Sequence, residues 1–223
     1  VKNNVNPIIF YIQEMKYDLV NAVDKEVCLG NPKDVLDEKG KPRDDKVIED
    51  KKFSELSNAQ KQMPIAYLNN KDNRDKSGDL FFPKNLGLNK KRASVLKKQI
   101  QEYRDFLIDL ADSNQLLIDE INMVCDVSNK GNGKKLQTWE EYNFVDMPSV
   151  GALTILSKIQ SDLRNIEADV INYLKRNIDA KSLKFTSAEG IQIPKTTFVL
   201  RGDSFRAEIF ITAKNENQNP DIY

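Results

Sequence analysis

The clearest pattern along the chain is a stripe of apolar residues between Thr138 and Leu174. From Ala152 onward, steps of four and three residues separate Ala152, Leu156, Ile159, Leu163, Ile166, Val170 and Tyr173. Those steps place the residues on one face of an α-helix, which turns once every 3.6 residues. The opposite face carries mainly charged, amide and hydroxyl side chains. The pattern therefore predicts a long helix that buries one side and serves first as a packing element.

Weaker stripes of the same kind predict shorter helices earlier in the chain. We expect a first helix over 7–27 and a second over 89–111, because their apolar residues also recur in helical steps. A third, shorter helix is expected over 113–124, where a Ser-Asn pair can cap its first turn. Residues 1–6 are expected to be frayed, and 57–63 fit a short helix that Pro64 would end.

Charged and glycine-containing stretches predict the connections. Residues 31–52 are dense in charge and contain Gly40 and two prolines, so they predict a long surface excursion with at most a short turn of helix. Residues 71–77 and 128–135 are expected to be solvated loops. The apolar run 80–83 is expected to anchor a loop on the core, with an exposed docking patch as the alternative.

The pattern changes after about residue 180, where aromatic and β-branched residues become frequent. Residues 196–200 and 204–213 are predicted to be strands, joined by a turn at 201–203. The predicted fold class is α+β: a mainly helical bundle over 1–180 whose long last helix leads into a short β segment over 181–223. Two or three strands rarely form a domain alone. They are therefore expected to pack on the bundle, pair with a second chain or begin a larger β-rich domain.

Composition removes several classes of site. The 223 residues include 34 Lys and Arg, 34 Asp and Glu, and no histidine. The zero net charge does not indicate a nucleic-acid surface or a polybasic membrane patch. Without histidine there is no Ser-His-Asp triad, Cys-His pair, HExxH zinc site or ExxH di-iron site. We therefore expect no enzyme activity, no catalytic residues and no cofactor.

The remaining ligand-like patterns are weak. Residues 128–135 lack the spacing of a phosphate-binding loop, and 72–79 do not match an EF-hand, so no metal site is predicted. The Arg-Gly-Asp tripeptide at 201–203 suits a hairpin turn. Cys28 and Cys125 are far apart in sequence and fit either a disulfide or two free buried thiols. The many carboxylates are expected to form a solvated face.

The aromatic and acidic cluster before the long helix has two readings. It can lock the preceding loop onto the bundle, or it can anchor an interface, because Trp and Tyr are favoured at interfaces. Together with the helical stripe it supplies the interface candidates, which are Trp139, Tyr142, Phe144, Leu156, Ile159, Leu163, Ile166 and Val170.

Several stretches resemble one known family. Residues 139–174 (WEEYNFVDMPSVGALTILSKIQSDLRNIEADVINYL) are similar to the long helix and its lead-in in the GldM/PorM family of gliding motility and type IX secretion in Bacteroidetes. Residues 193–223 resemble the entry into that family's second periplasmic domain. Residues 10–24 and 96–111 resemble two earlier helices of its first periplasmic domain, whereas 28–92 match only loosely.

The resemblance implies a mechanical role. Members of this family are anchored in the inner membrane by an N-terminal helix, which is expected to lie outside these 223 residues, and their periplasmic part dimerises. The implied partners are a second copy of the chain, a GldL-like motor protein of the inner membrane, and a GldK/GldN-like ring associated with the outer membrane. The implied function is a periplasmic transmission component of a molecular motor for protein transport. A helical sensor or ligand-binding domain of the periplasm is the alternative.

Overall fold

The computed structural model describes residues 1–49, 51–131, 136–182, 187–196 and 198–214. It is α+β and mainly helical, as the sequence predicts. The contacts divide the chain into two compact units, one of residues Val1–Ile171 and one of Asn172–Tyr223.

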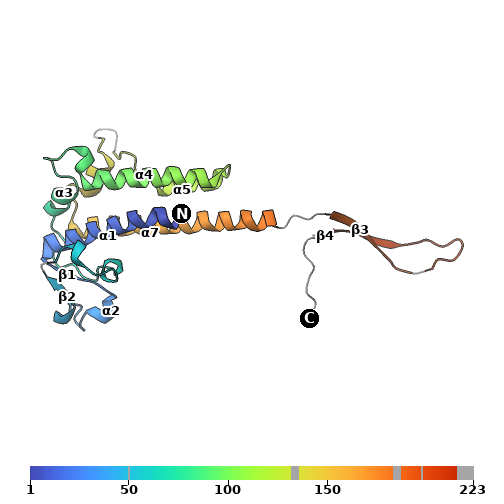
Figure 1. Cartoon of the computed structure of the whole chain (residues 1–223), viewed down its shortest axis with the longest axis horizontal. Coiled ribbons are helices and arrows are strands. Elements are labelled where there is room, and N and C mark those ends of the chain that lie inside the picture. The colour runs from blue at the N-terminus through green and yellow to red at the C-terminus, as the bar shows by residue number, and fades with distance from the viewer. Residues whose placement is uncertain (50, 132–135, 183–186, 197, 215–223) are drawn as a thin grey trace. The chain divides into compact units, whose positions relative to one another are not determined.

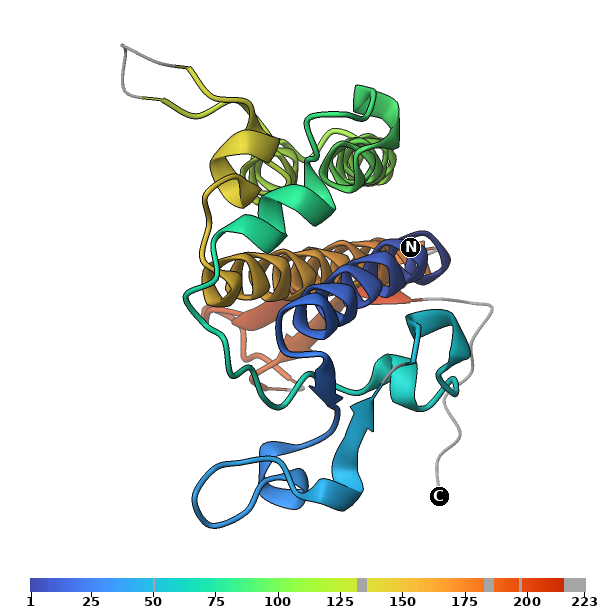
Figure 2. The ribbon, with the colours of Figure 1, turned by 90° about the vertical axis from the view of Figure 1, so that its left-hand side faces the viewer.

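Four longer helices build the first unit, namely α1 (Lys2–Asp24), α4 (Arg92–Ala111), α5 (Gln115–Val124) and α7 (Ser149–Ser182), of which α7 continues past Ile171. Figures 1 and 2 show α1 beside α7, with the pair formed by α4 and α5 above them. Helices α1 and α7 run antiparallel, because Asn6 contacts Arg164 whereas Lys16 contacts Gln160.

The apolar stripes of these helices meet in one core. The α4 stripe is buried at Ala93, Leu96, Ile100, Tyr103, Leu107 and Ala111. Helix α5 contributes Leu117 and Ile121, and the Asn114 side chain caps it by accepting a hydrogen bond from the Leu117 amide, as predicted. Burying each such aliphatic side chain stabilises the fold by about 1.5–3 kcal/mol. The predicted second and third helices are thereby confirmed.

The N-terminal helix differs from the prediction. Residues 1–6 are not frayed, because α1 begins at Lys2 and contains Pro7. The proline removes one backbone donor near the start of the helix. Val5 and Ile8 are nevertheless buried, and their burial offsets that loss. The helix also ends earlier than predicted, at Asp24, because Lys25 adopts a left-handed conformation with φ 62°.

The segment after α1 is more ordered than a surface excursion. Strand β1 (Glu26–Cys28) pairs antiparallel with β2 (Val47–Glu49), and the sequence pattern predicts neither strand. The predicted short turn of helix is α2 (Pro32–Val35). Gly30 precedes it with φ 132°, and a Cβ there would lie 2.9 Å from Val35 Cγ1, so the turn requires glycine.

Short 3-10 turns complete this segment: η1 (Asp44–Lys46), η2 (Phe53–Glu55), η3 (Gln60–Gln62) and η4 (Leu88–Lys90). The helix predicted over 57–63 is therefore only the single turn η3. Tyr17 and Val20 of α1 bury a small cluster with Val27, Phe53 and residues near them. That cluster fixes the excursion to the helical bundle.

Helices α3 (Asp75–Phe81) and α6 (Trp139–Phe144) lie at the end of the bundle where α4 begins. The loop predicted over 71–77 is thus partly helical. The predicted anchor is confirmed, because Phe81 is fully buried and packs edge-on against Phe144 with ring centroids 5.3 Å apart. Helix α7 begins directly after Pro148, as predicted.

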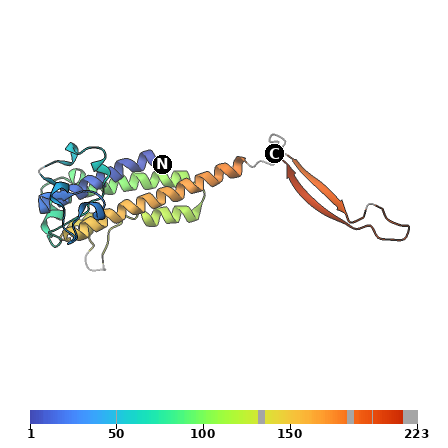
Figure 3. The same ribbon diagram turned by 90° about the horizontal axis from the view of Figure 1, so that it is seen from below.

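The second unit contains a hairpin of β3 (Ser187–Pro194) and β4 (Ala207–Lys214), paired antiparallel as Figure 3 shows. The strand predicted over 204–213 is confirmed as β4, which begins three residues later than predicted. The strand predicted at 196–200 is wrong for its described residues, 196 and 198–200, because the first strand of the hairpin lies earlier, at β3. The turn at 201–203 is present, with Gly202 at φ 99°.

Candidate interaction surfaces

The aromatic residues before α7 form a cluster inside the first unit. Trp139 packs edge-on against Phe144 with ring centroids 5.8 Å apart, and both side chains are at least 95% buried. Tyr142 lies on the same short helix but is 53% exposed. Of these three candidates, Tyr142 presents its side chain to solvent while the other two pack in the core.

Polar groups fix this cluster in place. Thr138 and Glu141 cap α6 reciprocally, because each side chain accepts a hydrogen bond from the other residue's backbone amide at 3.2 and 3.0 Å. The buried Ser77 hydroxyl lies 2.9 Å from the Phe144 carbonyl oxygen and 2.8 Å from that of Met147. These contacts connect α3 to the turn that leads into α7.

The stripe of α7 packs largely as predicted. Leu156, Leu163, Ile166 and Val170 are at most 1% exposed, and Ile159 is partly buried. Their side chains hold the helix against the bundle. Whether this helix also forms a contact with a second copy stays a prediction.

Buried polar groups of α4 and α7 lie inside the bundle. The carboxylate of Glu167 is buried and accepts a hydrogen bond from Arg164 Nη1 at 2.8 Å. Its other oxygen and the buried Tyr103 hydroxyl have no protein partner. Burial, with Glu167 nearby, raises the pKa of Tyr103 above its usual range. The raised pKa keeps the Tyr103 hydroxyl neutral at neutral pH.

Two grooves differ in their charge. The first lies between α1, η3 and α7, has a volume of about 580 Å³, and is lined by three cationic side chains and no acidic one. The second lies between α3 and α6, has a volume of about 780 Å³, and is lined by four acidic and two basic side chains. In the part of the chain that the structure describes, no three Asp, Glu or Cys side chains gather as metal ligands would.

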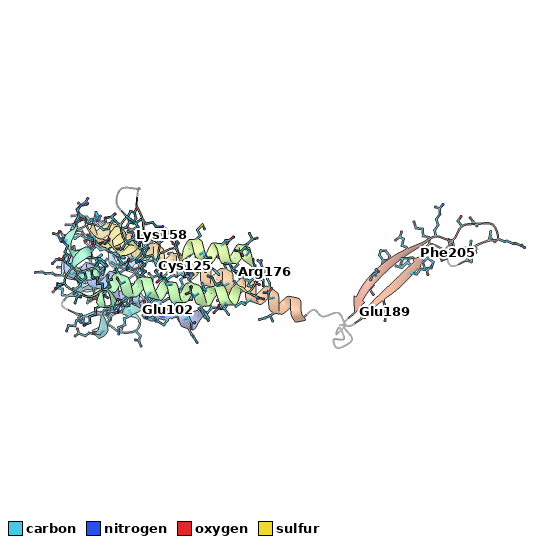
Figure 4. The ribbon with its side chains drawn as sticks, turned by 90° about the horizontal axis from the view of Figure 1, so that it is seen from above. Glu102, Cys125, Lys158, Arg176, Glu189 and Phe205 are labelled. Carbon is cyan, nitrogen blue, oxygen red and sulfur yellow. The ribbon has the colours of Figure 1, made fainter. Side chains whose placement is uncertain are left out.

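The hairpin exposes apolar side chains on both faces. Directly paired residues share a face, so Ile191 and Phe210 lie on one side, while Ile209 and Ile211 lie on the other. These four side chains are 46–83% exposed. Figure 4 shows side chains along the hairpin between the labelled Glu189 and Phe205. Within the described residues, neither face of this hairpin is covered.

Both cysteines are free and buried. Burial raises the pKa of the Cys125 thiol to about 11, and burial also raises the pKa of Cys28. Figure 4 shows Cys125 among the helices of the first unit. Both thiols are therefore protonated at neutral pH and poorly nucleophilic.

Comparison with known sequences decides the family. A sequence model described as the GldM N-terminal domain matches residues 46–177, which is more than half of the chain. The chain belongs to the GldM family. The match includes α3 to α6 and most of α7, and two of the stretches that carry the resemblance, 96–111 and 139–174. It does not reach 10–24 or 193–223, and residues 215–223 also lie outside the described structure.

The family gives a general context. GldM proteins belong to the machinery of gliding motility and type IX secretion, where they are structural components anchored in the membrane and located in the periplasm. None of the described helices combines the length and apolar character needed to cross a membrane. A comparison with curated proteins found no match.

Sequence reasoning did not predict the groove between α1, η3 and α7. Most of its lining residues are ordinary Lys, Arg, Asn and Gln side chains, and they come from three segments, 2–13, 61–62 and 160–165, that lie far apart in the sequence. No single stretch carries a signal for it. The charge pattern becomes visible only when the fold brings the three segments together.

Proposed function

We propose that this chain forms part of a periplasmic link that transmits movement from an inner-membrane motor to an outer-membrane-associated ring during type IX secretion and gliding. The observation that carries the proposal is the match of the GldM N-terminal domain to residues 46–177. The packing of the first unit supports it, because a densely packed core resists deformation and can therefore pass on a displacement.

In this proposal the chain acts as a homodimer with a GldL-like motor protein on one side and a GldK/GldN-like ring on the other. Residues 1–180 form the first periplasmic domain, and 181–223 begin a second, β-rich domain. A helix anchored in the inner membrane precedes them. The exposed apolar faces of the hairpin support self-association or coverage by further β structure. Among the interface candidates, Tyr142 can reach a partner because its side chain is already exposed.

The test changes the rotational phase of α7 in the full-length protein. Two helix-forming residues inserted after Arg176, beyond the last buried stripe position Val170, rotate everything downstream by about 200°. A seven-residue insertion at the same place rotates it by only about 20°. Each variant replaces the native gene in a gliding bacterium, and gliding speed and secretion of a type IX cargo are measured.

A transmission element is expected to lose gliding and secretion with two inserted residues and to keep a large part of both with seven. Immunoblots confirm equal amounts of each protein in the membrane fraction. If both insertions behave like the native protein, the chain is a passive tether and the transmission role is wrong. If the gene is dispensable for both processes, the family role itself does not apply to this chain.

A further inference from the structure

The groove between α1, η3 and α7 differs in charge from the rest of the chain. Its cationic side chains are Lys2, Lys61 and Arg164, one from each of the three elements. No Asp or Glu lines it, although the chain as a whole has as many acidic as basic residues. The groove is therefore locally positive in a protein of zero net charge, and it attracts negatively charged groups.

Side-chain hydrogen bonds hold its walls together. Gln13 Nε2 of α1 donates to the Met63 carbonyl at 2.6 Å, just after η3. Lys16 Nζ donates to Gln160 Oε1 at 2.7 Å, and Arg164 Nη2 donates to Asn6 Oδ1 at 2.9 Å, so both join α1 to α7. Gln13 and Lys16 are at least 94% buried. The groove is thus formed before any ligand arrives, which lowers the cost of binding.

Its uncharged lining suits a peptide. Five amide side chains line the groove, and three of them already use one group in the wall contacts. The other two, Gln62 and Asn165, can pair with the N–H and the C=O of a peptide backbone. Ile9 and the 41% exposed Phe10 provide an apolar surface for an aliphatic side chain. Arg164 is partly neutralised by Glu167. Lys61 Nζ donates to the Ser54 carbonyl at 3.1 Å, a contact that leaves its charge uncompensated, so Lys2 and Lys61 supply most of the positive charge of the groove.

We propose that this groove binds an acidic peptide segment of a partner protein. Its cations lie on three separate walls, whereas a site for a small anion brings its donors to one point. The groove between α3 and α6 is lined by more acidic than basic side chains. Of these two grooves, only the one between α1, η3 and α7 is positively charged. The inference does not depend on the proposed motor role.

The test measures binding of a fluorescein-labelled 12-residue peptide with the repeat Glu-Glu-Leu to the full 223-residue chain by fluorescence anisotropy. The double variant Lys2→Glu, Lys61→Glu is expected to weaken binding at least tenfold. The control variant Lys33→Glu, Lys98→Glu changes the net charge equally at two exposed lysines outside the groove and is expected to change affinity less than twofold. Thermal unfolding checks that both variants fold.

Three outcomes overturn the proposal. The first is that the native chain does not bind the acidic peptide at low salt. The second is that both double variants weaken binding equally, which indicates non-specific electrostatic attraction without a site. The third is that vesicles containing phosphatidylglycerol bind with the same dependence on Lys2 and Lys61 while the peptide does not, which makes the groove a membrane contact. A matched Gln-Gln-Leu peptide is expected to bind at least tenfold more weakly than the acidic one.

Discussion

The helical unit and the β-hairpin both carry regular apolar patterns, and only the first buries its pattern. Leu163 and Val170 of α7 are at most 1% exposed, whereas Ile209 and Ile211 of β4 are 76% and 83% exposed. Both regions use aliphatic residues, and in each the spacing of these residues matches the period of its secondary structure. The difference teaches that a pattern fixes which side of an element is apolar, while burial requires a second surface.

The two regions should therefore differ in what their side chains contribute to stability. The α7 stripe meets the rest of the bundle, and each buried aliphatic side chain contributes about 1.5–3 kcal/mol. The hairpin has two strands and, among the described residues, no covering layer. Such a hairpin is marginally stable in water. Single substitutions can test this comparison directly.

Replacing Leu163 by alanine is expected to have the largest effect. The side chain is 1% exposed in the middle of the stripe, so its loss leaves a cavity and costs roughly 2–5 kcal/mol of unfolding free energy. Urea denaturation followed by circular dichroism measures the loss. The matched control Leu116→Ala changes the same residue type at an 83% exposed position and is expected to stay within about 0.5 kcal/mol. Equal effects of the two changes would mean that α7 does not pack as described.

A smaller loss is expected when the buried hydroxyl of Ser77 is removed. Ser77→Ala leaves the carbonyl oxygens of Phe144 and Met147 without their shared partner, at a cost of roughly 1–3 kcal/mol. The exposed Ser54→Ala is the control and should be neutral. Thermal unfolding of both variants measures the difference. An unchanged Ser77→Ala would show that water replaces the hydroxyl and that this contact does not hold the entry to α7.

The elements with long regular patterns were predictable from the sequence. Helices α4 and α7 repeat their apolar spacing over five or more turns, so no other structure fits them. Strands β1 and β2 have three residues each, too few for an alternating pattern to be recognised. Strand β3 was missed because Gly190 and Pro194 are strand breakers. Gly190 is tolerated opposite Ile211, and Pro194 is the last residue of the strand.

The interface candidates show what a helical pattern cannot predict. The helical period correctly predicts that Leu156, Leu163 and Val170 share one side of α7. The period does not tell whether that side meets the same chain or another one. The cationic groove was beyond prediction for a related reason, since Lys2, Lys61 and Arg164 meet only through the packing of α1 on α7.

The buried thiol of Cys125 makes the helical unit sensitive to alkaline pH. Its pKa is raised to about 11 in the folded chain, whereas the unfolded thiol ionises near its ordinary value of 9. Between these values the unfolded state releases a proton that the folded state keeps, so stability is full below pH 9 and falls from pH 9 to 11, by roughly 1–2 kcal/mol.

Urea denaturation at a series of pH values measures this loss, and Cys125→Ala should flatten the difference between pH 9 and 10.5. The variant retains Cys28 and Tyr103, whose pKa values are raised in the same direction, so a reduced slope remains. Identical slopes in both proteins would place the Cys125 thiol in contact with water.

A cysteine introduced in the hairpin, Ile209→Cys, provides an exposed reference and should react with a thiol reagent at neutral pH far faster than either native cysteine.

The smallest effect is expected from Ile209→Ser in the hairpin. The side chain is 76% exposed, so serine leaves no cavity, and the unfolding free energy of the helical unit should change by less than about 0.5 kcal/mol. The measurement is the same urea titration used for Leu163→Ala. A loss above about 1.5 kcal/mol would show that this face is buried in solution. If that loss also depends on protein concentration, a second copy of the chain covers the hairpin. The difference in burial between α7 and the hairpin would then exist in the monomer and disappear in the dimer.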